Sequence, residues 1–180
     1  KVTSPVWLIG TAFTTLADVR GTLTPQLNTE EADTTLLLID LRKGKNRMGG
    51  SILAQTLELE DSNVPDLDDS KDLINLVNAI NELRAEDQVL AYHDRSDGGL
   101  FASACEMAFA GHVGVSLNID TLLAESEGIR DPVMDTGGGK TEELRVGTLR
   151  EELTLRALFN EELGALIQVR TESRNDVMQT

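Results

Sequence analysis

The sequence predicts an α+β fold, a layered mixed β-sheet with helices packed against it. Short runs of β-branched and aliphatic residues, typical of buried strands, recur along the chain. One stretch has the periodicity of an amphipathic helix. Strands and helices do not alternate in a strict βαβ rhythm, and no internal repeat is present. These observations together favour an α+β or layered mixed-sheet domain.

The predicted strands share an apolar and partly β-branched composition. Thr34–Leu41, with the sequence TTLLLIDL, has the composition of a central strand. Val113–Ile119 differs because its apolar residues alternate with others, the pattern of a half-buried strand. The complete set of predicted strands covers residues 6–9, 34–41, 89–92, 113–119 and 164–169.

The clearest predicted helix carries an apolar stripe, which we interpret as part of the core. Ser70 is its predicted N-cap after an acidic loop, and Ser51 is the predicted N-cap of a shorter helix. The stripe consists of Leu73, Leu76, Val77, Ile80 and Leu83. Predicted helices cover residues 52–59, 73–83, 100–110, 153–163 and the stretch from 172 onward.

The composition disfavours two classes of partner. Lys and Arg total 16 while Asp and Glu total 31, which gives a formal net charge of −15. Nucleic-acid binding through phosphates needs a basic face, and anionic membranes attract basic segments. The single cysteine cannot build a disulfide framework, and the longest strictly apolar runs have four residues. We therefore expect a reduced, cytoplasmic, acidic globular domain with neither nucleic acid nor membrane as its partner.

The length of 180 residues and 19.6 kDa fits one domain. We expect a flexible insertion at about residues 121–150, because residues 121–149 contain five glycines and few large apolar residues. The chain begins with Lys1 just before a predicted strand and stops at Thr180 within a predicted helix. We therefore expect residues 1–180 to be a fragment of a larger chain.

The most distinctive segment is HDRSDGG, residues 93–99, which links a predicted strand to a predicted helix. Carboxylates such as that of Asp94 are the ligands that Mg²⁺ prefers. A Ser96 hydroxyl can donate to a phosphate, and glycines at a helix start let the backbone approach one. The alternative is that Asp94, Ser96 and Asp97 only cap the helix and turn the chain. Both interpretations remain open on the residues alone.

A second strand-to-helix turn, residues 43–51, contains three glycines and the basic residues Lys43, Lys45 and Arg47. These cations could clamp an anion at the start of the following helix. The alternative is an ordinary basic turn that faces solvent.

Three other sequence features do not indicate a functional site. Gly137–Thr141 resembles the end of a phosphate-binding P-loop, but the required earlier glycine is replaced by Met134 and no strand precedes it. Cys105 lies in an Ala-rich helical run, so we interpret it as structural and not as a nucleophile. His93 has no histidine or cysteine at ligand spacing, which argues against zinc.

Several long motifs resemble large-type bacterial phosphoribosylformylglycinamidine synthase. They are AYHDRSDGGL, the following EMAFAGH, LFNEELGALIQV, and TPQL followed by the LLLIDL strand. The resemblance covers roughly residues 4–120 and 153–172. Residues 121–152 depart from the family pattern because they form a longer and more charged segment.

The resemblance implies a fold, an activity and partners. The family converts formylglycinamide ribonucleotide to formylglycinamidine ribonucleotide with ATP and glutamine in purine biosynthesis. This chain resembles the C-terminal domain of the second synthetase half, which is similar to the C-terminal domain of aminoimidazole ribonucleotide synthetase. Its implied partners are upstream ATP-binding-type domains and a downstream glutaminase domain of the same chain.

The resemblance also implies site residues and cofactors. Asp94 matches a Mg²⁺-binding aspartate of the family, and Ser96 matches a serine that contacts the nucleotide, ATP or ADP. Beyond these two positions, His93, Arg95 and Asp97 are candidate supports of that site. The site is auxiliary in the family, so no catalytic residue is expected in this chain and the isolated domain is expected to be inactive. The alternative is a non-catalytic interaction or scaffold domain in which HDRSDGG is a structural cap.

Overall fold

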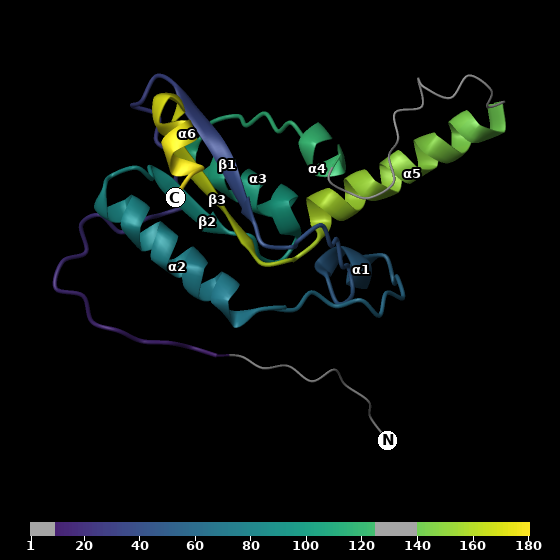
Figure 1. Cartoon of the computed structure of the whole chain (residues 1–180), viewed down its shortest axis with the longest axis horizontal. Coiled ribbons are helices and arrows are strands. Elements are labelled where there is room, and N and C mark those ends of the chain that lie inside the picture. The colour runs from purple at the N-terminus through teal and green to yellow at the C-terminus, as the bar shows by residue number, and fades with distance from the viewer. Residues whose placement is uncertain (1–9, 125–139) are drawn as a thin grey trace.

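The structure, a computed structural model, describes residues 10–124 and 140–180. Its centre is a three-stranded sheet in the order β1-β3-β2, built from β1 (Thr34–Asp40), β2 (Ala91–Asp94) and β3 (Gly164–Arg170) (Figure 1). Both strand pairs are antiparallel. The α+β class predicted from the sequence is confirmed, while the described sheet is purely antiparallel and not mixed.

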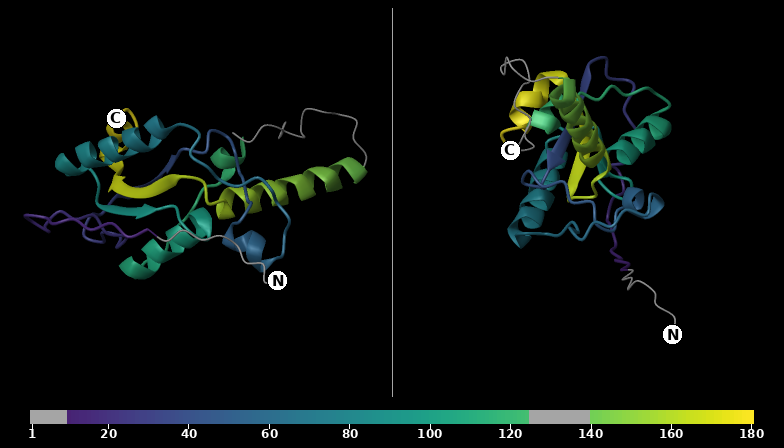
Figure 2. Two further views of the ribbon diagram at one scale, coloured as in Figure 1. Left: turned by 90° about the horizontal axis from the view of Figure 1, so that it is seen from below. Right: turned by 90° about the vertical axis from the view of Figure 1, so that its right-hand side faces the viewer.

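Helices cover both faces of this sheet. In Figure 2, α2 lies on one side of the strands and α3 on the other. The short helix α6 is on the α2 side, and α5 extends beyond one end of the sheet. The helices are α1 (Ile52–Thr56), α2 (Ser70–Ala85), α3 (Gly99–Gly111), α4 (Asp120–Ala124), α5 (Lys140–Phe159) and α6 (Arg174–Val177). Within the described residues, no helix is both long enough and apolar enough to cross a membrane.

The sheet separates two apolar cores. Leu36, Leu38 and Leu166 pack on the α3 side, whereas Leu37 and Ile167 pack on the α2 side. This division follows from the two-residue period of a strand, which sends neighbouring side chains to opposite faces. Because both faces are covered, the central strands are continuously apolar and do not alternate with polar residues.

The strand predictions succeed where both faces are buried. The predicted strands 34–41 and 164–169 are confirmed as β1 and β3 within one residue, and 89–92 is shifted to β2 at 91–94. The predicted strand Val113–Ile119 is wrong, because this segment joins α3 to α4 without entering the sheet. Its alternation still has a physical basis, since Val115 is half-buried against the α3-side core. The predicted strand at 6–9 lies outside the described residues.

The helix predictions differ mainly at helix starts. Ser51 is confirmed as an N-cap, since its hydroxyl accepts a hydrogen bond from Ala54 N at 3.2 Å. The N-cap of α2 is Asp69 and not Ser70, because the Asp69 carboxylate accepts from Lys71 N at 2.9 Å. The region predicted as an insertion, 121–150, contains the end of α4 and the first eleven residues of α5. Its predicted flexibility stays a prediction.

The apolar stripe of α2 is only partly a core feature. Leu76 and Leu83 are buried, as predicted, and Ile80 packs against the core that contains Leu83. Leu73 and Val77 are exposed, at 40% and 50%, so their assignment to the core was wrong. The apolar residues of α2 thus cover more of the helix surface than the part that is buried in the protein.

Candidate functional site

The HDRSDGG turn connects the end of β2 to the start of α3. Gly98 and Gly99 have φ angles of +82° and +67°, which side chains other than glycine rarely adopt. An added Cβ on Gly99 would lie 2.6 Å from the carbonyl oxygen of Asn160. The glycine pair is therefore required by the backbone and by the close approach of the segment that follows α5.

Arg95 is a buried anchor of this turn. Its guanidinium donates to the carbonyl oxygens of Glu162 and Leu163, at 2.5 and 2.9 Å, and to Asp40 Oδ1 at 2.9 Å. These bonds join the end of β2 to the end of β1 and to the residues just before β3. Arg95 therefore positions the turn within the fold and has no exposed group to offer a ligand, since its side chain is 1% exposed.

Asp94, Ser96 and Asp97 are the exposed polar side chains of the turn. Within the described residues, the side chains of Ser96 and Asp97 make no hydrogen bond, and the Asp94 carboxylate accepts one from the Tyr92 hydroxyl. The N-cap of α3 is Gly98, which has no side-chain cap. The prediction that these side chains cap α3 is therefore wrong, whereas Ser96 does help to turn the chain, because its carbonyl oxygen accepts from Gly99 N.

The main chain of Asp94 is held firmly although its carboxylate is exposed. The Asp94 carbonyl oxygen accepts from Ser103 Oγ at 3.0 Å and lies 2.7 Å from His93 Nδ1. The second ring nitrogen, Nε2, is 2.7 Å from Glu106 Oε2. His93 therefore links the turn to α3, which fits its candidacy as a support of the turn.

The Tyr92 phenol remains a hydrogen-bond donor over the whole neutral range. Partial burial raises its pKa above the ordinary value of 10.0, and the Asp94 carboxylate beside it raises the pKa further. The protonated phenol orients one carboxylate oxygen of Asp94, so the other oxygen is left for a ligand.

The basic turn at residues 43–51 is neutralised by carboxylates. Lys43 Nζ lies 2.6 Å from Asp72 Oδ2, and Lys45 Nζ lies 2.9 Å from Asp68 Oδ2. The Asp72 carboxylate raises the pKa of Lys43, and Lys45 lowers the pKa of Asp68 below its ordinary 3.8. Asp68 lies in the acidic loop before α2, and Asp72 lies in the first turn of α2.

Arg47, the third cation of the turn, is held by a buried carboxylate. Its Nε and Nη2 donate to the two oxygens of Glu162 at 2.7 and 2.6 Å, and its backbone N–H donates to the same group at 3.0 Å. Glu162 is 1% exposed, and this pairing raises the pKa of Arg47. All three cations are thus occupied, and the anion-clamp interpretation of this turn is not supported.

The two turns meet at Glu161. Glu161 Oε1 accepts from Ile52 N at 2.8 Å and from Gly98 N at 2.9 Å. The Gly99 N–H donates to the Ser96 carbonyl oxygen at 2.9 Å. The backbone donors expected to cradle a phosphate are therefore already bonded within the protein. Sequence reasoning assigned no role to Glu161 or Glu162, and the only signal was an acidic pair directly before a buried strand.

The described residues do not by themselves form a metal site. No group of three or more His, Cys, Asp or Glu side chains within them could hold a metal ion. The exposed Asp94 carboxylate fits one position in the oxygen shell of Mg²⁺, and further ligands would have to come from elsewhere. Cys105 is half-buried in α3 and belongs to no such group.

A comparison with protein families matches residues 32–180, from just before β1 to the end of the chain. The matching family is described as the C-terminal domain of AIR synthase related protein. The match spans the whole sheet, the HDRSDGG turn and all of both cores except Leu23 and Leu27. It agrees with the α+β fold and with the family-level part of the resemblance drawn from the sequence. The chain therefore belongs to the family of AIR synthase related proteins, as a C-terminal domain.

Proposed function

We propose that this chain is part of an ATP- and glutamine-dependent ligase that converts formylglycinamide ribonucleotide to formylglycinamidine ribonucleotide. In this proposal it is the C-terminal domain of the second synthetase half of phosphoribosylformylglycinamidine synthase. Upstream ATP-binding-type domains and a downstream glutaminase domain supply the remaining machinery. The domain contributes Asp94 and Ser96 to an auxiliary Mg-nucleotide site and contains no catalytic residue.

The family assignment supports the general part of this proposal, because the family occurs in ATP-utilising synthetases. The finer part is supported by the long motifs that surround the turn. AYHDRSDGGL, EMAFAGH and LFNEELGALIQV together span β2, α3, the end of α5 and β3. These segments pack against one another, so the resemblance concerns a contiguous part of the fold.

One observation supports the site proposal most strongly: some residues of HDRSDGG are needed by the fold, and others are not. Arg95, Gly98 and Gly99 are explained by the fold, through buried hydrogen bonds or positive φ angles. Asp94 and Ser96 are exposed, and neither side chain is needed to cap α3. Polar side chains that a rigid turn holds at the surface without a structural role favour a role in binding.

Each group has a definite task in the proposed site. The Asp94 carboxylate supplies one oxygen to Mg²⁺, which would neutralise the phosphates of a bound nucleotide. Ser96 donates its hydroxyl to a phosphate oxygen. Tyr92, as a neutral donor, fixes the Asp94 carboxylate, and His93 with Ser103 fixes the Asp94 main chain. The Gly98 N–H remains with Glu161, so the protein contribution comes from side chains.

The activity is tested by growth of a purine auxotroph that lacks this synthase. The gene product that contains this chain is expressed in the auxotroph, and growth without added purine is scored together with glutamine-dependent formation of the amidine product in extracts. We expect growth and product formation. A stable, well-expressed gene product that restores neither would contradict the proposal and would favour an interaction or scaffold domain.

A further inference from the structure

One side of α2 exposes three large apolar side chains. Leu73, Ile74 and Val77 are exposed by 40%, 57% and 50%. With about 3.6 residues per turn, these three positions lie along one side of the helix, together with Asn78 and Asn81. None of the five residues is charged, although the chain has a net charge of −15. We call Leu73, Ile74 and Val77 the α2 flank.

One ion pair shows which edge of the sheet the α2 flank faces. α2 lies along one face of the sheet (Figure 2), and its Asp72 pairs at 2.6 Å with Lys43, which follows β1. The Asp72 side of the helix therefore faces the β1 edge. At about 100° per residue, Val77 is turned about 140° away from Asp72, with the buried Leu76 between them. The α2 flank therefore faces the other edge of the described sheet, which is β2.

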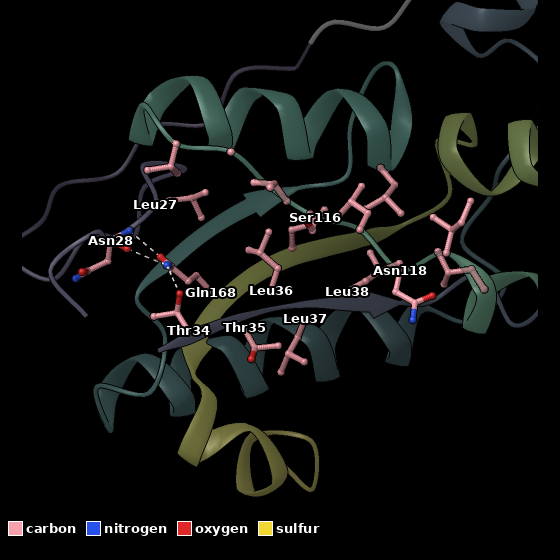
Figure 3. Close-up of a pocket in the computed structure, with 18 of the residues that line it drawn as sticks. Leu27, Asn28, Thr34, Thr35, Leu36, Leu37, Leu38, Ser116, Asn118 and Gln168 are labelled. Carbon is pink, nitrogen blue, oxygen red and sulfur yellow. Dashed lines mark hydrogen bonds between the residues drawn. The ribbon is translucent and has the colours of Figure 1, made fainter. Parts of the chain in front are cut away.

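The Asp94 carboxylate lies on the same face of the sheet as α2. Neighbouring side chains of a strand point to opposite faces. Figure 3 shows this for β1, where Leu36 and Leu38 point into a groove of about 990 Å³ and Leu37 points the other way. In β2, Tyr92 packs against the same core as Leu37, and its hydroxyl donates to the Asp94 carboxylate. That core is the one beneath α2.

The α2 flank and Asp94 also share one end of the sheet. β1 and β2 both end opposite the first two residues of β3. The ion pair between Lys43 and Asp72 places the first turn of α2 at that end. The α2 flank starts in the same turn, with Leu73. The candidate metal-binding carboxylate and an uncharged apolar surface therefore lie at the same end and on the same face of the domain.

The chain enters the domain along the same edge. Thr24 O accepts from Tyr92 N at 2.9 Å on the outer side of β2, and Leu23 packs against the core beneath α2. Residues 10–20, just before this segment, lie outside any helix or strand and expose Phe13 at 92%. The family match starts only after this segment. A domain that precedes it in the gene product would therefore be tethered beside the α2 flank.

We propose that the α2 flank is the docking surface for the upstream domain of the same gene product. This inference rests on the proposed function, which requires upstream ATP-binding-type domains. The upstream domain covers Leu73, Ile74 and Val77 with an apolar surface of its own and lies beside Asp94. From there it supplies further oxygen ligands to Mg²⁺, which the described residues do not provide.

Tethering explains how a small surface can hold its partner. Stable interfaces between separate proteins use about 20–30 residues on each side, far more than the α2 flank offers. Two copies of a chain with net charge −15 would also repel each other. A domain joined by a short connection has an effective concentration in the millimolar range, so a small uncharged contact is enough to dock it. These arguments favour the tethered domain over a second copy.

Cysteine labelling measures whether the α2 flank is covered. Val77→Cys and Ile74→Cys are each introduced into the gene product that contains this chain and into the 180-residue chain, and alkylation of that position is followed by peptide mass spectrometry. Both positions should react at least about tenfold more slowly in the gene product, because only undocked molecules expose them. Equal rates in the two proteins would overturn the proposal.

Val64→Cys is the matched control for this experiment. Val64 is the same residue type as Val77, is similarly exposed (58%), and lies in the loop before α2. Its alkylation should proceed at the same rate in the gene product and in the 180-residue chain. Slowing at position 64 equal to that at positions 74 and 77 would show general shielding, and would overturn docking at the α2 flank.

A photo-reactive maleimide attached at position 77 identifies what covers the flank. Crosslinks to peptides that precede this chain in the gene product would support the proposal. Crosslinks to peptides after residue 180, to residues 10–20 or to a second copy would overturn the assignment to the upstream domain. An active synthase in which positions 74 and 77 react freely would refute the docking alone. An inactive gene product that protects both positions would refute the proposed function alone.

Discussion

The two strand-to-helix turns of this domain look alike in sequence and differ in what they expose. Both combine glycines with charged residues, and both precede a helix. In the turn at 43–51, every basic side chain is paired with a carboxylate. In the turn at 93–99, the Ser96 and Asp97 side chains are unpaired within the described residues, and there the Asp94 carboxylate is bonded only by Tyr92. The candidate site therefore differs from the structural turn because its polar side chains are free to bind a ligand, and not because it contains different residue types.

The difference arises from distant segments of the chain. The basic turn is covered by Asp68 of the acidic loop, by Asp72 in the first turn of α2, and by Glu162, which lies 115 positions after Arg47. Within the described residues, no Lys or Arg side chain pairs with Asp94 or Asp97, and the Arg95 guanidinium is buried. A sequence pattern gives the chemical groups of a turn, while the fold decides which groups are already used.

The largest expected effect separates the glycines of the two turns. Gly99→Ala should lower the free energy of unfolding by about 4 kcal/mol, since its Cβ would meet Asn160 O at 2.6 Å in addition to the strain of a positive φ. Gly44→Ala has a similar φ of +77° but open space around it, so it should cost only about 1 kcal/mol. Urea unfolding of both variants measures this, and equal losses would contradict the described packing behind HDRSDGG.

The next effect concerns the carboxylate that neutralises the basic turn. Glu162→Gln should lower the free energy of unfolding by about 3 kcal/mol, because it removes a buried charge that binds Arg47 through both oxygens. Chemical denaturation measures the loss. A change of less than about 0.5 kcal/mol, the range of ordinary surface substitutions, would show that Arg47 is not held as described.

Alkaline pH provides a third test, since Tyr92 is the only tyrosine of the chain. Its folded pKa is raised above 10.0, so the native state keeps the phenolic proton longer than the unfolded chain does. The resulting stabilisation is complete below pH 10.0 and is lost as pH rises through the folded pKa. Absorbance at 295 nm should show a midpoint above 10 in native protein and near 10 in denaturant. Equal midpoints in native and denatured protein would contradict both the partial burial of Tyr92 and its hydrogen bond to Asp94.

The smallest expected effect is on stability at the candidate site. Ser96→Ala and Asp97→Asn should each change the free energy of unfolding by less than about 0.5 kcal/mol, because both side chains are exposed and unbonded within the described residues. Thermal melting of the two variants beside the wild type checks this. A loss above about 1 kcal/mol in either variant would restore a structural role for the turn.

The parts of the fold that could be predicted are those set by local patterns. Thr34–Leu41 and Gly164–Val169 are short apolar runs of strand composition, and Ser51 has a capping position that needs only its neighbours. Segment 113–119 was mistaken for a strand because alternation reports one buried face and not a pairing partner. Sequence reasoning began the last long helix at residue 153, whereas α5 starts at Lys140 within a glycine-containing, charged stretch.

In the candidate site, too, residues could be predicted where neighbouring residues define their role, but not where distant contacts define it. Asp94 and Ser96 could be singled out from the turn itself, and the family assignment supports the choice. The roles of Glu161 and Glu162 could not, since Glu161 bonds Ile52 and Gly98 across long sequence separations. Those two carboxylates decide which backbone donors and which cations remain available to a ligand.

The central claim is that Asp94 serves ligand binding and not folding. The most direct test measures nucleotide retained by the gene product that contains this chain, after gel filtration in Mg²⁺ and acid release. Asp94→Asn should lose the retained nucleotide while its content of folded protein is unchanged, and Asp176→Asn, an exposed carboxylate on α6, should retain it. Equal retention in wild type and Asp94→Asn would contradict the account.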